Sequence, residues 1–198
     1  MGLVIRLFDV VIAFTVLLIF APLLIIVALI IKLTSKGPVL FRQVRVGRHD
    51  IDFRILKFRT MLINADKLGS LTVGARDPRV TSIGYFLRKY KLDELPQLIN
   101  VLIGDMSIVG PRPELRKYVD MYTSEQKKIL AIRPGITDYA SIEYRNENEL
   151  LAAAANPELF YIEQVMPQKI RLNYKYLHNR NPVNYFKVIF STIFPSVN

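Results

Sequence analysis

Two adjacent carboxylates, Asp93 and Glu94, and an arginine between two prolines, Arg112, have residue types and spacing that suit phosphate chemistry. A carboxylate can serve as a nucleophile in phosphoryl transfer, and Mg²⁺ prefers carboxylate oxygens combined with phosphate oxygens. An arginine offers a planar fork of donors for phosphate, and flanking prolines reduce the entropy cost of ordering it. This short stretch therefore carries the parts of a phosphoryl-transfer site.

The residues around the carboxylates predict a helix that begins at Asp93. Asp is a favourable N-cap residue, Pro96 is tolerated in a first turn, and apolar residues recur at helical spacing up to Gly104. The partial positive charge of a helix N-terminus would favour an ionised Asp93 and a phosphate beside it. The alternative is that Asp93 only caps the helix and Glu94 is a solvated first-turn acid.

An apolar segment precedes this stretch. The chain has no charged residue from Val10 to Ile31, which is long enough for a straight helix to cross a hydrocarbon core of about 30 Å. Its length, the lysines that follow and the lack of an A-x-A-like site argue against a cleaved signal peptide. Pro22 lies near the middle and should bend the helix. A kinked spanning helix and a re-entrant hairpin both fit, and these physical arguments alone favour the span.

Composition limits the classes of partner. The chain has 198 residues, 27 Lys plus Arg against 17 Asp plus Glu, a formal net charge of +10 and no cysteine. This length suits one domain plus an anchor, and thiolate metal sites are excluded. The positive charge suits anionic lipids, phosphorylated substrates or nucleic acid. We expect no nucleic-acid partner, because no zinc finger, RNP-like motif or long basic run is present.

After the anchor the pattern changes to that of a small α+β domain. Alternating β-branched and aromatic residues predict a β-hairpin, with Arg42, Arg45, Lys57 and Arg59 on a solvated basic face that would contact lipid phosphates or a nucleotide. Arg6 and Asp9 are spaced to pair on one helix face. The other predicted segments are strands at 39–46 and 51–58, a loop at 63–80, and helices at 83–91, 113–131 and, from a start signature at Asn156 and interrupted by Pro167, 156–179.

Several ordered motifs together resemble the bacterial sugar transferase family, the small monotopic polyprenyl-phosphate phosphoglycosyl transferases. The likeness is strong over residues 3–145. The motifs are Lys-Phe-Arg-Thr-Met at 57–61, Asp-Pro-Arg-Val-Thr at 77–81, Gly-Tyr-Phe-Leu-Arg at 84–88, Leu-Asp-Glu-Leu-Pro-Gln at 92–97, Asn-Val-Leu at 100–102, Gly-Asp-Met-Ser at 104–107, Gly-Pro-Arg-Pro at 110–113 and Arg-Pro-Gly-Ile-Thr at 133–137.

The resemblance implies a particular architecture. Residues 1–36 would form an anchor whose helix breaks at Pro22 and re-enters the same membrane face, although Ala21 stands where the family commonly has serine. Residues 37–198 would form a mostly helical, membrane-associated catalytic domain with a small β-hairpin and interfacial C-terminal helices. The expected location is the cytoplasmic face of the bacterial inner membrane.

The resemblance also implies a reaction and roles for individual residues. A sugar 1-phosphate would pass from a UDP-sugar to polyprenyl (undecaprenyl) phosphate, with UMP released and a covalent intermediate on Asp93. Glu94 would bind Mg²⁺, with Asp93 as a second candidate ligand, and Arg112, Arg88 and Arg79 would bind substrate phosphate. The residues expected to support the pocket are Lys57, Arg59, Thr60, Asp77, Gln97, Arg133 and Thr137.

Three points stay open from the sequence. A non-catalytic basic scaffold at the membrane surface, binding anionic lipid or a partner protein, is the alternative to an enzyme. The chain departs from the family at residues 138–141, Asp-Tyr-Ala-Ser, so that we expect this segment to influence which sugar is accepted. A homo-oligomer is compatible with the sequence, as is a monomer.

Overall fold

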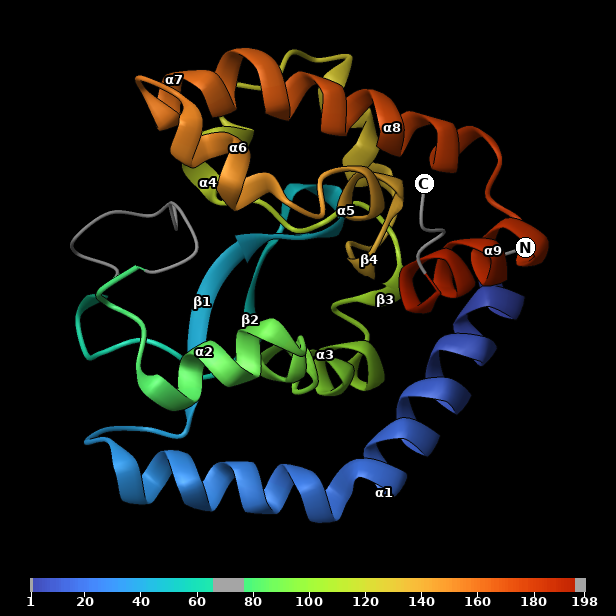
Figure 1. Cartoon of the computed structure of the whole chain (residues 1–198). Helices are drawn as coiled ribbons and strands as arrows, with labels where there is room; N and C mark the ends of the chain where they lie inside the picture. Colours follow the sequence, from blue (N-terminus) through green and yellow to red (C-terminus); the bar gives the residue numbers. More distant parts are fainter. Residues whose placement is uncertain (1, 66–76, 195–198) are drawn as a thin grey trace.

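The apolar N-terminal run forms one helix, α1 (Gly2–Thr34), in the computed structural model, which describes residues 2–65 and 77–194. The helix is bent near its middle, and the rest of the chain lies on the inner side of the bend (Figure 1). Pro22 lies inside the helix and gives the bend a physical cause, since it has no N–H to donate. The expected break at Pro22 is therefore a bend within a continuous helix.

The first half of α1 is attached through Asp9, which is only 1% exposed. Its Oδ1 accepts hydrogen bonds from the Ser107 hydroxyl at 2.9 Å, the Ile108 main-chain N–H at 2.8 Å and the Tyr185 hydroxyl at 2.9 Å. A buried carboxylate requires such donors to offset its loss of water. The expected Arg6–Asp9 pair is thus wrong, because Asp9 turns into the protein interior.

Arg6 binds a different part of the same body. Its guanidinium donates to the carbonyl of Val101 at 2.6 Å and to that of Leu102 at 3.0 Å, near the end of α3 (Gln97–Ile103). The last carbonyls of a helix have no partner within the helix, so they attract a cation. Arg6 and Asp9 together fix the first half of α1 to the globular part.

The second half of α1 packs against that body as well. Val27 and Ile31 are buried and form an apolar cluster with Phe58 and Leu87. Many large apolar side chains of α1 are exposed, because they point away both from this cluster and from the body that Arg6 and Asp9 bind. They include Leu3, Leu7, Phe14, Leu18, Ile19, Ile25, Ile26, Leu29 and Leu33. Helix α1 is long and apolar enough to cross a membrane. It contacts the protein at both ends of its length and exposes apolar side chains along it.

The predicted β-hairpin is confirmed. Strands β1 (Leu40–Val46) and β2 (Asp52–Phe58) pair antiparallel around a short 3₁₀ turn, η1 (Arg48–Asp50). The side-chain amide of Asn100 on α3 bridges to β2: it accepts from the Leu56 N–H and donates to the Arg54 carbonyl, both at 2.9 Å. The hairpin and α3 are therefore held in a fixed relation.

The segment with the carboxylates differs from the expectation. Helix α2 (Ser82–Lys89) is followed by a 3₁₀ turn, η3 (Leu92–Glu94), and α3 begins only at Gln97. Asp93 caps no helix, so the predicted helix start at Asp93 is wrong. Pro96 has no N–H, which interrupts the hydrogen-bond ladder between the 3₁₀ turn and α3.

A two-stranded parallel sheet joins the carboxylate segment to the C-terminal half. Strand β3 (Ser107–Val109) pairs with β4 (Gly135–Thr137). Gly110, directly after β3, makes a close backbone contact with Gly135, the first residue of β4: a Cβ on Gly135 would lie 2.1 Å from the Gly110 nitrogen. Only glycine fits there, so the loop that carries Arg112 leaves β3 in a fixed direction.

The C-terminal half is mostly helical. It covers the upper part of the molecule in Figure 1, except for its last helix, which lies at the right beside the start of α1. A buried apolar cluster lies between its helices and the end of β1, and includes Val46, Tyr118, Tyr161 and Ile170. The described elements are α4 (Arg116–Val119), η4 (Gln126–Ala131), α5 (Tyr139–Glu143), α6 (Glu147–Ala153), α7 (Pro157–Phe160), the π-helical turn η5 (Tyr161–Val165), α8 (Met166–His178) and α9 (Pro182–Ile193).

Two helix predictions in this half have different outcomes. The start at Asn156 is confirmed, since its side chain accepts from the Leu159 N–H at 3.1 Å. The prediction of a single helix at 113–131 is wrong, because Thr123 and Gln126 cap each other's N–H groups and start a separate 3₁₀ segment.

Of the predicted loop at 63–80, residues 66–76 lie outside the described residues. The α+β class with a long apolar N-terminal helix is confirmed.

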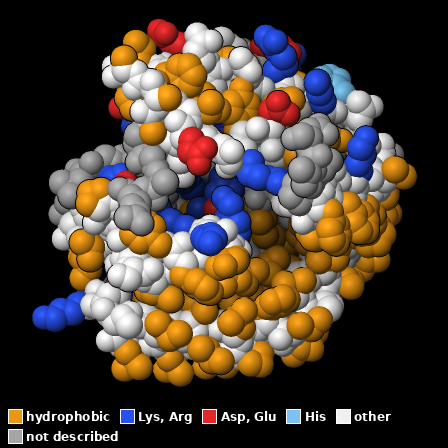
Figure 2. Space-filling model, in the orientation of Figure 1, with side chains coloured by type: hydrophobic (Ala, Val, Ile, Leu, Met, Phe, Trp, Pro, Cys, Tyr) orange, Lys and Arg blue, Asp and Glu red, His pale blue; other side chains and the backbone are white. Residues whose placement is uncertain are grey.

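The aromatic residues of the C-terminal helices divide between the core and the surface. Tyr176 and Tyr185 are buried in the core, whereas Phe190 and Phe194 are more than half exposed. Figure 2 shows hydrophobic side chains gathered on the lower and right-hand parts of this face, where Figure 1 places α1 and α9. A surface of this extent marks an interaction site for a membrane or another protein.

Gly84 provides a test of the packing of α2 on the end of β2. A Cβ at Gly84 would lie 2.1 Å from the Thr60 carbonyl oxygen. We expect Gly84→Ala to lower the free energy of unfolding by about 1–3 kcal/mol, because the helix must move away from the strand. Thermal unfolding in detergent micelles measures this, with Gly2→Ala as control since nothing lies within 4 Å of its Cβ. Equal melting temperatures for Gly84→Ala and the unchanged protein would contradict the packing.

Candidate active site

The two carboxylates lie in η3, between α2 and α3, and face cations that come from three different parts of the fold. Asp93 is 7% exposed, and the Glu94 side chain is 13% exposed. In Figure 2 Lys and Arg side chains gather in a hollow in the middle of this face, above the apolar surface. The hairpin supplies Lys57, α2 supplies Arg88, and the loop after β3 supplies Arg112.

Glu94 is paired with two of these cations. Lys57 Nζ lies 2.8 Å from Glu94 Oε1, and the Arg112 guanidinium binds both carboxylate oxygens, with Nη1 3.2 Å from Oε2. Burial alone would raise the pKa of Glu94, but Arg112 and Lys57 hold it well below its usual range. Glu94 is therefore ionised and firmly placed.

At Lys57, unlike at Glu94, burial outweighs the effect of the oppositely charged partner on the pKa. Burial lowers the pKa of its ammonium group, while the nearby Glu94 carboxylate opposes that shift. The pair is stable as an ion pair only because each partner compensates the other's loss of water. Removal of either charge would leave the other buried without a partner.

Asp93 is less compensated than its neighbour. Burial first, and then the adjacent Glu94 charge, raise the pKa of Asp93, while Lys57, Arg88 and Lys91 act against this shift. No hydrogen bond to its carboxylate is formed by the residues that the structure describes. The expectation that a helix N-terminus favours its ionised form is therefore wrong. A buried, weakly solvated carboxylate is well suited to nucleophilic attack.

The loop that carries Arg112 is held from its main chain. The Arg112 N–H donates to Asp138 Oδ2 at 3.0 Å, and the other oxygen of this fully buried carboxylate caps α5 at the Ser141 N–H. The following Glu114 accepts from the Tyr161 hydroxyl. Arg112 therefore reaches Glu94 from a braced backbone. Sequence reasoning missed Asp138 in this role, although its position before α5 is a normal N-cap signal.

Arg88 and Arg79 have different surroundings. Arg88 Nε donates to the Thr60 hydroxyl at 2.9 Å, which places both residues at the end of β2 next to Asp93. Arg79 Nη2 lies 2.6 Å from Asp77 Oδ2, and this contact lowers the pKa of Asp77. The Asp77–Arg79 pair braces the segment before α2.

The remaining predicted residues lie around this centre at varying distance. Arg59 donates to the Ser35 carbonyl at 2.9 Å and to its hydroxyl at 2.6 Å, at the junction with α1. Gln97 is 1% exposed, and its amide has no partner among the described residues. Arg133 donates to the Gly104 carbonyl at 2.7 Å, and Thr137 bonds Thr192 at 2.7 Å. These hydrogen bonds of Arg133 and Thr137 are with residues other than the two carboxylates.

The donor set fits a magnesium ion. No group of three or more His, Cys, Asp or Glu residues forms a metal cage within residues 2–65 and 77–194. Mg²⁺, however, usually takes one or two protein carboxylates and completes its coordination with substrate phosphates and water. Glu94 and Asp93 offer such oxygens. Because Lys57 and Arg112 now bind Glu94, a metal ion would have to share or displace these contacts.

Known proteins resemble this chain in sequence. The chain matches the bacterial sugar transferase family over residues 2–198. It is 48% identical to a UDP-N-acetylgalactosamine-undecaprenyl-phosphate N-acetylgalactosaminephosphotransferase of Aeromonas hydrophila, over 58% of this chain and 28% of that one. It is 36% identical to the UDP-glucose:undecaprenyl-phosphate glucose-1-phosphate transferase of Escherichia coli, over 96% of this chain and 39% of that one.

A third relative has a length closer to that of this chain. The uncharacterized sugar transferase EpsL of Bacillus subtilis is 42% identical over 71% of this chain and 69% of its own length. In contrast, the chain covers well under half of the Aeromonas and Escherichia proteins. Because the family match extends over nearly the whole chain and includes the carboxylates and their cations, this chain belongs to the bacterial sugar transferase family.

Proposed function

We propose that this chain is an enzyme that transfers a sugar 1-phosphate from a UDP-sugar to polyprenyl phosphate and releases UMP. The observation that carries the proposal is the buried Asp93–Glu94 pair, surrounded by Lys57, Arg88 and Arg112. Two relatives are named for a transfer of this kind to undecaprenyl phosphate. An apolar helix attached to the same body suits a lipid substrate.

In the first step the Asp93 carboxylate attacks the phosphorus that bears the sugar. A bond forms between an Asp93 oxygen and this phosphorus, and the bond to the bridging oxygen breaks, so that UMP leaves with the electron pair. Arg112 and Arg88 would bind the phosphate oxygens, on which negative charge is concentrated. The product on the enzyme is an acyl phosphate, which is reactive enough to pass its group on.

In the second step a phosphate oxygen of the lipid attacks the same phosphorus. The bond to Asp93 breaks, the carboxylate is restored, and a polyprenyl diphosphate sugar is released. A phosphate monoester has a second pKa of about 6, so the acceptor is largely a dianion near neutral pH and needs no general base. This agrees with a site in which Asp93 is the nucleophile and Glu94 is already paired.

Glu94 is the residue that would hold Mg²⁺, with Asp93 and substrate phosphates as further ligands. When bound, the ion would offset negative charge on the diphosphate. Lys57 and Arg112 bind Glu94 in this structure, and on this proposal they would turn to the substrate phosphates once the ion is bound. The side chains of Lys57 and Arg112 would thus bind first Glu94 and then the substrate phosphates.

The proposal includes a re-entrant anchor on the cytoplasmic face of the bacterial inner membrane. Arg6 and Asp9 in the first half of α1, and Val27 and Ile31 in the second half, all contact the same globular body. A helix that spanned the membrane would place one of these halves on the opposite side from that body. Both ends of the anchor should therefore lie on the same membrane face as that body, and the family resemblance makes this face the cytoplasmic one.

The nucleophile is tested by Asp93→Asn. The amide nearly preserves the shape of the side chain, so the fold should survive, but UMP release from the UDP-sugar should fall about 10³-fold or more. Glu94→Gln should also be impaired and should require more Mg²⁺, since an amide is a weaker ligand for a hard cation. Lys91→Gln, which changes a neighbouring charge, is the control. Turnover near the unchanged rate in a folded Asp93→Asn protein would rule out the nucleophile.

The anchor topology is tested with single cysteines in this cysteine-free chain. Cysteines placed at Gly2 and Lys36 should be equally protected from an impermeant thiol reagent in intact cells, and equally labelled after the cells are opened. Pro22→Leu removes the physical cause of the bend and should increase the spanning form. If one position alone is labelled from outside in the unchanged helix, α1 spans the membrane.

The segment from Asp138 to Glu143 should influence the choice of sugar. Asp138 connects it to Arg112, and the ring of Tyr139 packs edge-on against Tyr176 at 6.4 Å. We expect Tyr139→Ala and Ser141→Ala to change the ratio of kcat/KM between two UDP-sugars by about tenfold. Tyr144→Ala, just after the same helix, is the control. A uniform loss for every UDP-sugar would mean that the segment is only structural.

A further inference from the structure

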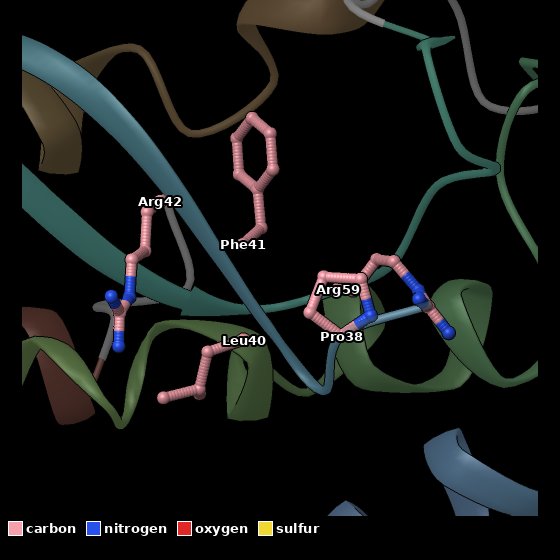
Figure 3. Close-up of a pocket in the computed structure, with 5 residues that line it drawn as sticks. All are labelled: Pro38, Leu40, Phe41, Arg42 and Arg59. Carbon is pink, nitrogen blue, oxygen red and sulfur yellow. The ribbon is translucent and has the colours of Figure 1, made fainter. Parts of the chain in front are cut away.

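The four basic residues predicted to form a solvated face on the hairpin do not share one surface. Side chains alternate along a strand, and Figure 3 shows Arg42 and Phe41 on opposite sides of β1. The register places Phe41 opposite Lys57, so Lys57 lies on the Phe41 face, as does Arg45 four residues along β1. Arg59 is only 6% exposed. The prediction of one solvated basic face is therefore wrong, and Arg45 shares its face of the hairpin with Lys57.

The side chain of Arg45 is held in one orientation. Its Nε and Nη2 donate to Gln43 Oε1 at 3.0 and 2.7 Å, and Gln43 lies two residues away on the same strand face. The remaining nitrogen, Nη1, donates to the Pro113 carbonyl at 3.2 Å. Only 20% of the Arg45 side chain is exposed. Gln43 thus orients the guanidinium of Arg45 toward the loop that follows β3.

This contact holds the main chain immediately after Arg112. Pro113 is the next residue, and the one after it is also tied to β1, because the Val46 N–H donates to the Glu114 carbonyl at 2.9 Å. On its other side the loop is held by the hydrogen bond that the Arg112 N–H donates to a buried carboxylate. Arg45 and Val46 therefore complete a brace that fixes the backbone on both sides of Arg112.

Arg45 also lies close to the charges of the site. Burial lowers the pKa of Arg45; Glu114 opposes this shift, the charge of Arg112 adds to it, and Glu94 opposes it more weakly. The guanidinium groups of Arg45 and Arg112 are thus close enough to repel each other. Among the described residues, Arg45 forms no hydrogen bond or ion pair with Asp93 or Glu94. Its effect on the chemistry would therefore pass through Arg112.

We propose that Arg45, oriented by Gln43, is a positioning residue that holds the Arg112 guanidinium where it binds the phosphates of the UDP-sugar. This inference deepens the proposed function and rests on it for the identity of the substrate. A guanidinium fork binds phosphate oxygens well only in the correct plane and position. A displacement of about 1 Å in a substrate-positioning group is enough to slow a reaction about 10²-fold. The alternative is that Arg45 only stabilises the fold.

The first test measures UMP release in a single turnover, with UDP-sugar and no acceptor. Arg45→Met should slow it about tenfold, and Arg45→Lys should recover part of the loss, because a lysine keeps the charge and a donor for Pro113. Gln43→Ala should slow it about threefold, and it carries the test if Arg45→Met does not fold. Arg54→Met is the matched control, since Arg54 is exposed on β2 of the same hairpin. Unchanged rates for Arg45→Met and Gln43→Ala would overturn the inference.

A double-mutant cycle with Arg112→Lys distinguishes positioning from a purely structural role. Arg112→Lys keeps the charge and loses the planar fork. Because Arg45 acts through that fork, Arg45→Met should slow the Arg112→Lys protein by less than about twofold, as expected for coupled residues. If the two losses multiply in the double variant, Arg45 stabilises the fold alone and the inference is wrong.

Main-chain hydrogen exchange separates this inference from the proposed function, because it requires no turnover. The peptide that contains Arg112 and Glu114 should exchange about tenfold faster in Arg45→Met than in the unchanged protein or in Arg54→Met, while α9 keeps its rate. Equal exchange in all three proteins would contradict the brace. Failure of the unchanged protein to release UMP from any UDP-sugar would contradict the proposed function, and the exchange rates would still report on the brace.

Discussion

The ion pairs of buried Glu94 with Lys57 and Arg112 are the constraint on which the rest of the site depends. A buried carboxylate is costly unless charged partners surround it, so the hairpin and the loop after β3 must both approach η3. Secondary contacts serve this requirement: Asn100 fixes α3 to β2, and Asp138 holds the backbone of Arg112. With Glu94 neutralised in this way, Asp93 is left as the less compensated carboxylate.

A buried carboxylate also fixes the position of helix α1 relative to the candidate site. Asp9 is a buried carboxylate in an otherwise apolar helix, and its three donors come from β3 and α9, so the orientation of α1 is fixed relative to the body. Strand β3 leads directly into the loop of Arg112, and α3 follows the two carboxylates. The apolar helix α1 and the site with the two carboxylates therefore have a fixed position relative to each other. This arrangement suits a reaction between a water-soluble donor and a lipid acceptor.

Sequence patterns correctly predicted the structures that depend on interactions between residues close together in the chain. The alternation in the hairpin and the cap at Asn156 were recovered, because each depends on neighbouring residues. The start of α3 was misplaced, since one missing N–H at Pro96 outweighed the capping preference of Asp93. The partners of Arg6, Asp9 and Arg59 lie far away in the chain, so no spacing rule reveals them. The roles of Asp93 and Arg112 came from resemblance to a family, and the structure supplied their common environment.

Peptide mass spectrometry of the protein after reaction with a UDP-sugar tests the central claim most directly. The unchanged protein and Asp93→Asn are each exposed to a UDP-sugar without acceptor, quenched in acid and digested. The account predicts a sugar-phosphate adduct on the peptide that contains Asp93 in the unchanged protein, no adduct in Asp93→Asn, and loss of the adduct when polyprenyl phosphate is added. Efficient product formation with no adduct at any time after mixing would contradict it and would favour direct attack by the lipid phosphate.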